Sequence, residues 1–340
     1  MKRFLLYLIV PMAIILISSA GFYGYWNSAD PVKTCASCHE ITPSVSTWQH
    51  SAHREVKCFD CHGTALSNGL HSLKEKTNMV FTHISEEKQN DEIRMTEAQV
   101  LEVEQRCAGC HQDEYGKWKT GGHGTNYRNI FLNQVHNSEE RLYWDCLRCH
   151  GMFFEGNIYD LVTPISTIGP WSLLDPDKEL HPVIPCQTCH KIHTENSPYK
   201  SGIQAPDRNP SYGLYVRAEK FHLRGDHLPV PEMYHGDQQI KVSDDPVQAL
   251  CVQCHAPGAF HFAGTSDDRT PTGVHEGLSC SSCHEPHSNN PKNSCISCHP
   301  AISNCGLDVT KMNTTHFYAN SPNNIHFVAC TDCHEDLLKD

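Results

Sequence analysis

One five-residue pattern, C-x-x-C-H, occurs nine times in this chain and constrains its fold more than any other feature. The copies are CASCH 35–39, CFDCH 58–62, CAGCH 107–111, CLRCH 146–150, CQTCH 186–190, CVQCH 251–255, CSSCH 280–284, CISCH 295–299 and CTDCH 330–334. A C-x-x-C pair alone could bind zinc or act as a redox dithiol, but here a histidine directly follows every pair. C-x-x-C-H is the attachment signature of c-type haem, because two thiols at this spacing reach both vinyl groups of one porphyrin and the adjacent imidazole lies under the iron. The sequence therefore predicts nine covalently attached haems c.

Each motif residue has a predicted role. The predicted attachment residues are Cys35, Cys38, Cys58, Cys61, Cys107, Cys110, Cys146, Cys149, Cys186, Cys189, Cys251, Cys254, Cys280, Cys283, Cys295, Cys298, Cys330 and Cys333. The predicted proximal iron ligands are His39, His62, His111, His150, His190, His255, His284, His299 and His334. The remaining cysteine, Cys305, is expected to be a buried inert thiol, with haem ligation or intermolecular pairing as alternatives.

Nine haems would change what this chain must bury. Hydrophobic residues make up 39% of the 340 residues, which is low for one large core. We expect the porphyrins to supply most of the buried apolar surface. The predicted fold class is a multihaem cytochrome c, haem-packed, with mostly short α-helices and loops, little sheet and one N-terminal transmembrane helix.

Two stretches between the motifs carry a local structural signal. Residues 86–106 form the longest helix candidate, because Thr96 and Gln99 fit a capping box and an apolar face then leads into CAGCH. Residues 164–185 carry several prolines and are expected to form a loop.

The N-terminus predicts a membrane anchor. Lys2 and Arg3 precede an almost uninterrupted apolar run over residues 4–20, and about 20 apolar residues would span a bilayer. The basic residues would stay in the cytoplasm, so the haem domain of an inner-membrane protein would lie in the periplasm. Ser18 and Ala20 also satisfy the small-residue rule for signal cleavage, so secretion after cleavage is the alternative.

Histidines outside the motifs could supply the sixth iron ligand. Six stand at recurring offsets: His53, His181 and His275 precede a motif by five residues, His326 precedes one by four, and His193 and His287 follow a proximal histidine by three. Eight further candidates, for which a surface imidazole is the alternative, are His71, His83, His123, His222, His227, His235, His261 and His316. We rank His50 and His136 below these. Each distal histidine is expected to bind the iron of a neighbouring haem, because so short a loop cannot easily wrap its own porphyrin.

The N-terminal third resembles a known family. CASCHEITPSVSTWQHSAHREVKCFDCHG (35–63) follows closely behind the apolar segment, and KEKTNMVFTHISEE lies further on. With the anchor, W-x-x-S-x-H and a second motif ending DCHG, residues 1–112 resemble the NapC/NirT/NrfH family of membrane-anchored quinol dehydrogenases. The remainder loosely resembles octahaem and pentahaem oxidoreductases, although no motif here ends in lysine as in the nitrite reductases.

The resemblance implies that the chain takes electrons from menaquinol or ubiquinol near its first haem. It makes Lys74, Lys76 and His83 quinol-site candidates, with a solvated helix face as the alternative for both lysines. NrfH-type members carry a methionine two residues after the first proximal histidine, whereas this chain has Ile41, so the first haem must use another ligand or stay five-coordinate.

Three segments are predicted. Residues 1–27 would form the signal-anchor helix, 28–112 a NapC/NirT-like domain with three haems, and 113–340 a C-terminal domain with six.

The sequence favours an electron-transfer protein over an enzyme. It would carry electrons from quinol through stacked haems to a periplasmic or outer-membrane redox protein. The alternative is a reductase or oxidase of a small nitrogen or sulfur compound at one five-coordinate haem, with candidate catalytic residues Arg217, Lys220, His222 and Arg224. A subunit of an extracellular cytochrome wire is a third possibility. The net charge of -12 argues against a nucleic-acid partner, and the sequence leaves the oligomeric state open.

Overall fold

The computed structural model describes separate parts of the chain. They are residues 2–28, 30, 32–33, 36, 41–63, 96–138, 141–142, 146–163, 168–169, 171–190, 233–235, 237–241, 243, 245–255, 271–288, 298–299 and 325–329. The chain divides into two units, one of residues 1–95 with 192–196 and the other of residues 96–191 with 197–340.

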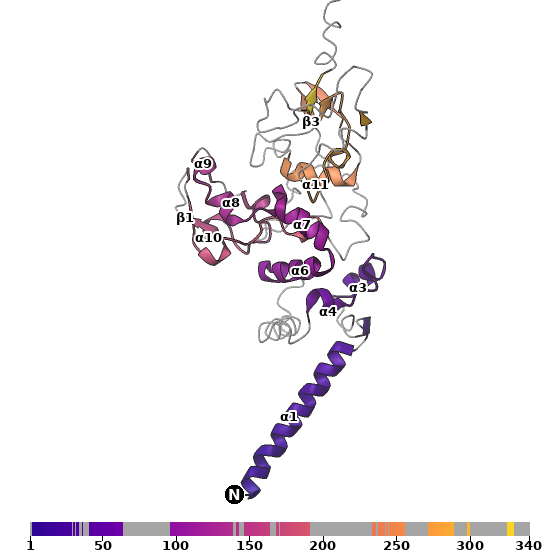
Figure 1. Ribbon diagram of the computed structural model, residues 1–340, viewed down its shortest axis with the longest axis vertical. Helices are drawn as coiled ribbons and strands as arrows, with labels where there is room; N and C mark the ends of the chain where they lie inside the picture. Colours follow the sequence, from indigo (N-terminus) through magenta and orange to yellow (C-terminus); the bar gives the residue numbers. More distant parts are fainter. Residues whose placement is uncertain are drawn as a thin grey trace, which may run out of the picture. The chain divides into compact units, whose positions relative to one another are not determined.

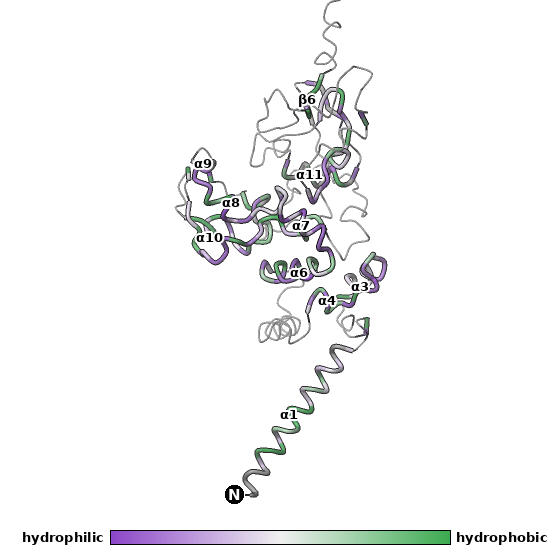
Figure 2. Tube along the Cα trace, viewed as in Figure 1, coloured by the Kyte–Doolittle hydropathy of each residue, from purple (hydrophilic) through white to green (hydrophobic). Residues whose placement is uncertain are grey.

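The first unit begins with one long apolar helix. Helix α1 (Lys2–Ser28) is drawn in indigo in Figure 1, and hydrophobic residues recur along it in Figure 2. Its segment Tyr7–Tyr25 is long and apolar enough to cross a membrane, and none of that segment is buried. At about 1.5 Å per residue such a segment matches the roughly 30 Å hydrocarbon layer of a bilayer. The predicted N-terminal membrane-spanning helix is therefore present as a helix of suitable length and composition.

Two short helices follow in the same unit, α3 (Thr42–Gln49) and α4 (Cys58–His62). The turn between them is fixed by Trp48, whose indole N–H donates to the carbonyl oxygens of His53 at 2.8 Å and Val56 at 3.0 Å. The buried hydroxyl of Ser51 accepts from the backbone N–H of His53 at 3.1 Å. The W-x-x-S-x-H pattern thus folds the loop that carries His53 just before CFDCH.

The second unit consists of short helices and very short strands, as the fold class predicts. Its helices are α6 (Glu97–Cys110), α7 (Gln112–Thr120), η2 (Gly122–Gly124), α8 (Tyr127–Phe131), α9 (Gln134–Asn137), η3 (Cys146–Arg148), α10 (Ile158–Leu161), η4 (Pro176–Lys178), η5 (Cys186–Thr188), α11 (Pro246–His255) and η9 (Cys280–Ser282). Its strands are β1 (Val162–Thr163), β2 (Ser172–Leu173), β3 (Met233–His235), β4 (Gln238–Ile240), β5 (Thr272–Gly273) and β6 (Phe327–Val328). They pair as antiparallel β1–β2 and β3–β4 and parallel β5–β6.

Helix α6 confirms the predicted capping box and extends further than expected. The Thr96 N–H donates to Gln99 Oε1 at 2.7 Å, and Thr96 Oγ1 accepts from the Gln99 N–H at 3.3 Å. The helix continues through the first four residues of CAGCH, whereas residues 86–95 lie outside the described part of the chain. The expected loop over 164–185 contains β2 and η4 within its described residues.

The second unit also has a small side-chain core. Its buried members are Tyr127, Phe131, Leu147, Phe154, Ile158, Leu161, Val162, Trp171, Leu173 and Val183. Leu147 is the first of the two residues between the cysteines of CLRCH and is 1% exposed. Side chains therefore surround this attachment motif directly, and it is held against α8 and α10.

Candidate haem-binding sites

The described C-x-x-C-H motifs have the same local conformation, a helical turn. In four of them the N–H of the histidine donates to the carbonyl oxygen of the first cysteine, at 2.8 to 3.0 Å: His111 to Cys107, His150 to Cys146, His190 to Cys186 and His284 to Cys280. Residues three apart on a helical turn lie on the same face. Both thiols of a motif therefore point to one side, as attachment to a single porphyrin requires.

Histidine rings from distant parts of the chain face these motifs in pairs. Each pair joins a motif histidine to a histidine outside the motifs. Four such pairs lie within the described residues: His190 with His287 (ring centroids 5.8 Å apart), His284 with His326 (6.0 Å), His123 with His255 (6.2 Å) and His275 with His299 (6.3 Å).

This spacing fits one metal ion between two imidazoles. A metal–imidazole bond of about 2 Å, with roughly 1 Å more from nitrogen to ring centre, puts two axial ring centres about 6 Å apart. Direct packing of two flat rings would bring their faces closer. The pairs His190–His287 and His284–His326 are also nearly parallel, at 9° and 8°. The residues present therefore fit haem iron with two histidine ligands.

The second ring nitrogen of the non-motif histidines is held by an acceptor. His123 Nδ1 lies 3.2 Å from the carbonyl oxygen of Pro286, and His275 Nδ1 lies 3.0 Å from that of Ile325. Because a carbonyl oxygen only accepts, Nδ1 carries the proton and Nε2 is left as the metal-binding atom. Burial lowers the pKa of His123. The hydrogen bond to the Pro286 carbonyl acts in the opposite direction but is the smaller effect. A neutral imidazole is the form that binds iron.

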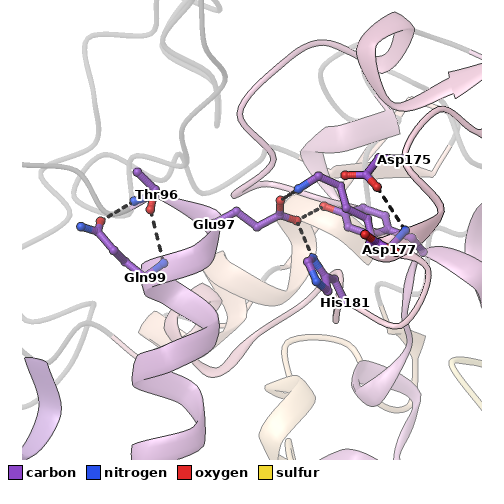
Figure 3. Close-up of polar contacts among 8 residues, drawn as sticks. Thr96, Glu97, Gln99, Asp175, Asp177 and His181 are labelled. Atoms are coloured by element: carbon purple, nitrogen blue, oxygen red, sulfur yellow. Dashed lines mark hydrogen bonds and ion pairs between the residues drawn. The ribbon is translucent and has the colours of Figure 1, made fainter. Parts of the chain in front are cut away.

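A buried carboxylate lies beside His181. Figure 3 shows Glu97 at the start of α6 between its partners from later segments. The Tyr127 hydroxyl donates to Glu97 Oε1 at 2.8 Å, Lys178 Nζ forms an ion pair with Oε2, and His181 Nδ1 lies 3.8 Å from Oε1. Glu97 is only 5% exposed. The carboxylate thus faces the Nδ1 side of His181 and leaves the opposite nitrogen for a metal.

Two attachment motifs pack against two others. The end of α6 contacts η5, and α11 contacts η9. The Cys251 thiol hydrogen-bonds Cys280 and lowers the pKa of the Cys280 thiol to about 7. Burial raises the pKa of Cys186 to about 12, and the nearby Glu104 and Cys107 add to this. Motifs far apart in the sequence are therefore neighbours.

Many predicted residues lie outside the described part of the chain. They are Cys35, Cys38, His39, His71, Lys74, Lys76, His83, His193, Arg217, Lys220, His222, Arg224, His227, His261, Cys295, Cys305, His316, Cys330, Cys333 and His334, and the His136 and His235 side chains. For the described candidates, the structure brings His123, His275, His287 and His326 opposite motif histidines. The backbone carbonyl of His53 accepts a hydrogen bond from Trp48, and His181 Nδ1 lies 3.8 Å from the Glu97 carboxylate. Iron ligation at each of them stays a prediction.

Sequence reasoning missed three buried polar residues, Glu97, Glu104 and Gln248. Glu104 and Gln248 each stand three residues before the first cysteine of a motif. That shared offset is the signal that could have found them.

Comparisons with known proteins point to c-type cytochromes. The Class III cytochrome C family matches residues 40–124, and the family of cytochrome c554 and c-prime matches residues 106–161 and 225–285. The cytochrome c-type protein NrfH of Wolinella succinogenes is 25% identical over 162 residues, which cover 46% of this chain and 85% of that protein. No solved structure matches the chain significantly. The chain is a multihaem c-type cytochrome that is similar to NrfH, binds haem c covalently and takes part in electron transfer.

Proposed function

We propose that the chain carries electrons from a membrane quinol, through haems at all nine motifs, to a periplasmic or outer-membrane redox partner. The four histidine pairs near 6 Å are the observation that carries this proposal. Iron with two histidine ligands has no open position for a substrate and exchanges electrons without changing its ligands. The described pairs therefore favour conduction over chemistry on a bound substrate.

Helix α1 and the likeness to NrfH support the membrane end of the proposal. An uncleaved α1 would hold the haem-binding part at the periplasmic surface of the inner membrane, where quinol is within reach. Each quinol oxidised there would yield one quinone, two protons and two electrons. Lys74, Lys76 and His83 are proposed to bind the quinol head group.

The proposed path uses motifs that are already neighbours. CAGCH at the end of α6 meets CQTCH, which begins in η5, and CVQCH in α11 meets CSSCH, which begins in η9. Haems attached at neighbouring motifs would lie close enough to exchange electrons directly. The candidate catalytic residues of the reductase alternative, at positions 217–224, lie outside the described part of the chain.

Quinol should reduce the detergent-extracted, full-length protein rapidly. A menaquinol analogue is added under anaerobic conditions and the ferrous haem absorption is followed with time. A variant in which residues 1–28 are replaced by a cleavable signal peptide should keep its haem content and its reduction by dithionite. Its reduction by quinol should fall at least about tenfold, because the donor site at the membrane surface is lost.

Full-length protein that dithionite reduces but quinol does not would remove the quinol part of the proposal. Intact-mass measurement of the same sample should give the uncleaved chain plus nine haems. A lower haem number would remove the nine-haem path, and a chain starting after residue 20 would favour the secreted alternative.

A further inference from the structure

The second unit repeats one packing arrangement with a single chemical difference. In each copy a helix that carries the cysteines of one C-x-x-C-H motif packs against a 3₁₀ turn that begins another such motif, α6 against η5 and α11 against η9. The first cysteine of the helix motif is in electrostatic contact with the first cysteine of the turn, Cys107 with Cys186 and Cys251 with Cys280. The two copies therefore bring their attachment sites together in the same way.

Each copy buries a polar side chain at the same position, three residues before the helix cysteine. Glu104 occupies it on α6 and is 2% exposed; Gln248 occupies it on α11 and is 1% exposed. Gln248 Oε1 accepts from the backbone N–H of Cys280 at 2.8 Å, and the Glu104 carboxylate accepts from the backbone N–H of Cys186. The uncharged Gln248 amide and the ionisable Glu104 carboxyl thus make the same hydrogen bond to the first cysteine of the turn that faces them.

Only the carboxyl can bind a proton. Burial raises the pKa of the Glu104 carboxyl to about 7. The hydrogen bond from the Cys186 N–H acts in the opposite direction but is the smaller effect. Glu104 Oε2 is buried and has no hydrogen-bond partner, so a proton can be placed there. Cys186, the first residue of η5, is in electrostatic contact with Glu104, and Cys107 on the helix of Glu104 and Cys189 just after η5 are in turn near Cys186. All three become thioethers when haem is attached and then no longer titrate.

We propose that Glu104 is a redox-linked proton site, which binds one proton from solvent when a haem attached at Cys107 or Cys186 is reduced and releases it on reoxidation. The proposal rests on the proposed function, which places haem at both motifs. The balance is one electron from the quinol side and one proton on a carboxylate oxygen, so the charge of the buried region does not change. Glu104 contacts the turn through the backbone of Cys186, which attaches haem and is not an iron ligand.

The direction of the effect follows from electrostatics. An electron placed beside a buried carboxylate disfavours its charged form and raises its pKa, so reduction draws in a proton. Acid therefore favours reduction, and the midpoint potential falls as pH rises. A full one-proton link changes the potential by about 59 mV for each tenfold change in proton concentration.

The test uses the full-length holoprotein and two variants on one helix, Glu104→Gln and Glu102→Gln. Haem potentials are measured by spectroelectrochemical titration at pH 6, 7 and 8, and redox-difference infrared spectra are recorded for the carboxylic acid C=O band. Wild type should show a pH-dependent potential and an acid band that grows on reduction. Glu104→Gln should lose both, because Gln248 shows that an amide fits this place. Glu102 is partly exposed and ion-paired with Arg106 at 3.8 Å, so its variant should keep both.

An unchanged slope in Glu104→Gln with complete haem content would overturn the proton site and leave the proposed function intact. Absence of the acid band in wild type between pH 6 and 8 would overturn it without any variant. If peptide mass mapping shows that wild-type Cys107 or Cys186 carries no haem, the proposed function is overturned instead.

Discussion

Replacing His287 with alanine is expected to turn one haem per chain from low-spin to high-spin. The His287 ring lies parallel to that of His190, with centroids 5.8 Å apart, which fits a single iron between them. Two imidazoles hold haem iron low-spin, and removal of one leaves an open position. Loss of an axial imidazole should also raise the reduction potential of that haem, on the order of 0.1 V. Ferric EPR, optical spectra and carbon monoxide binding to the reduced protein measure the change.

The matched control is His50→Ala. His50 is exposed, and its Nδ1 bonds the carbonyl oxygen of Ser46 at 2.7 Å within its own helical turn. This variant should keep the wild-type spectra. His326→Ala should behave as His287→Ala does, because His326 faces His284 at 6.0 Å with nearly parallel rings. A His287→Ala protein with complete haem and no high-spin signal would show that His287 is not an axial ligand.

The attachment sites could be predicted from the sequence because their chemistry is local. Five consecutive residues supply both thiols and one iron ligand, and a single helical turn arranges them. The opposite ligands are a different problem. The offset of His275 from CSSCH marks it as a candidate, but its ring faces His299 of the following motif. Only the fold of the whole unit determines which ring faces which motif.

The buried carboxylates could not be predicted for a related reason. Glu97 and Glu104 lie on the same side of α6 as Val100, at spacings of three, four and seven residues. Charged residues of a short helix are usually solvated, and nothing local distinguishes these two. Their burial depends on partners from much later in the chain, Lys178 for Glu97 and Cys186 for Glu104.

Replacing Lys178 with methionine is expected to lower the free energy of unfolding by about 3 kcal/mol. Methionine keeps the packing of the aliphatic stem beside the Phe154 ring, over which Lys178 Nζ lies at 5.4 Å. The loss is therefore one of charge. It leaves the Glu97 carboxylate buried with the Tyr127 hydroxyl as its remaining hydrogen-bond donor among the described contacts. Denaturant unfolding of the holoprotein at pH 7, followed by far-ultraviolet circular dichroism, measures the change.

The neighbouring ion pair provides the control. Arg128 and Glu179 also form an ion pair, but the arginine side chain is 57% exposed, and water can solvate the Glu179 carboxylate when the arginine is removed. Arg128→Met should therefore unfold close to wild type. The double variant Lys178→Met with Glu97→Gln should recover part of the loss, because it removes the uncompensated charge as well as its partner. If Lys178→Met is no less stable than Arg128→Met, the buried Glu97 carboxylate does not need the charge of Lys178, and this ion pair contributes little to stability.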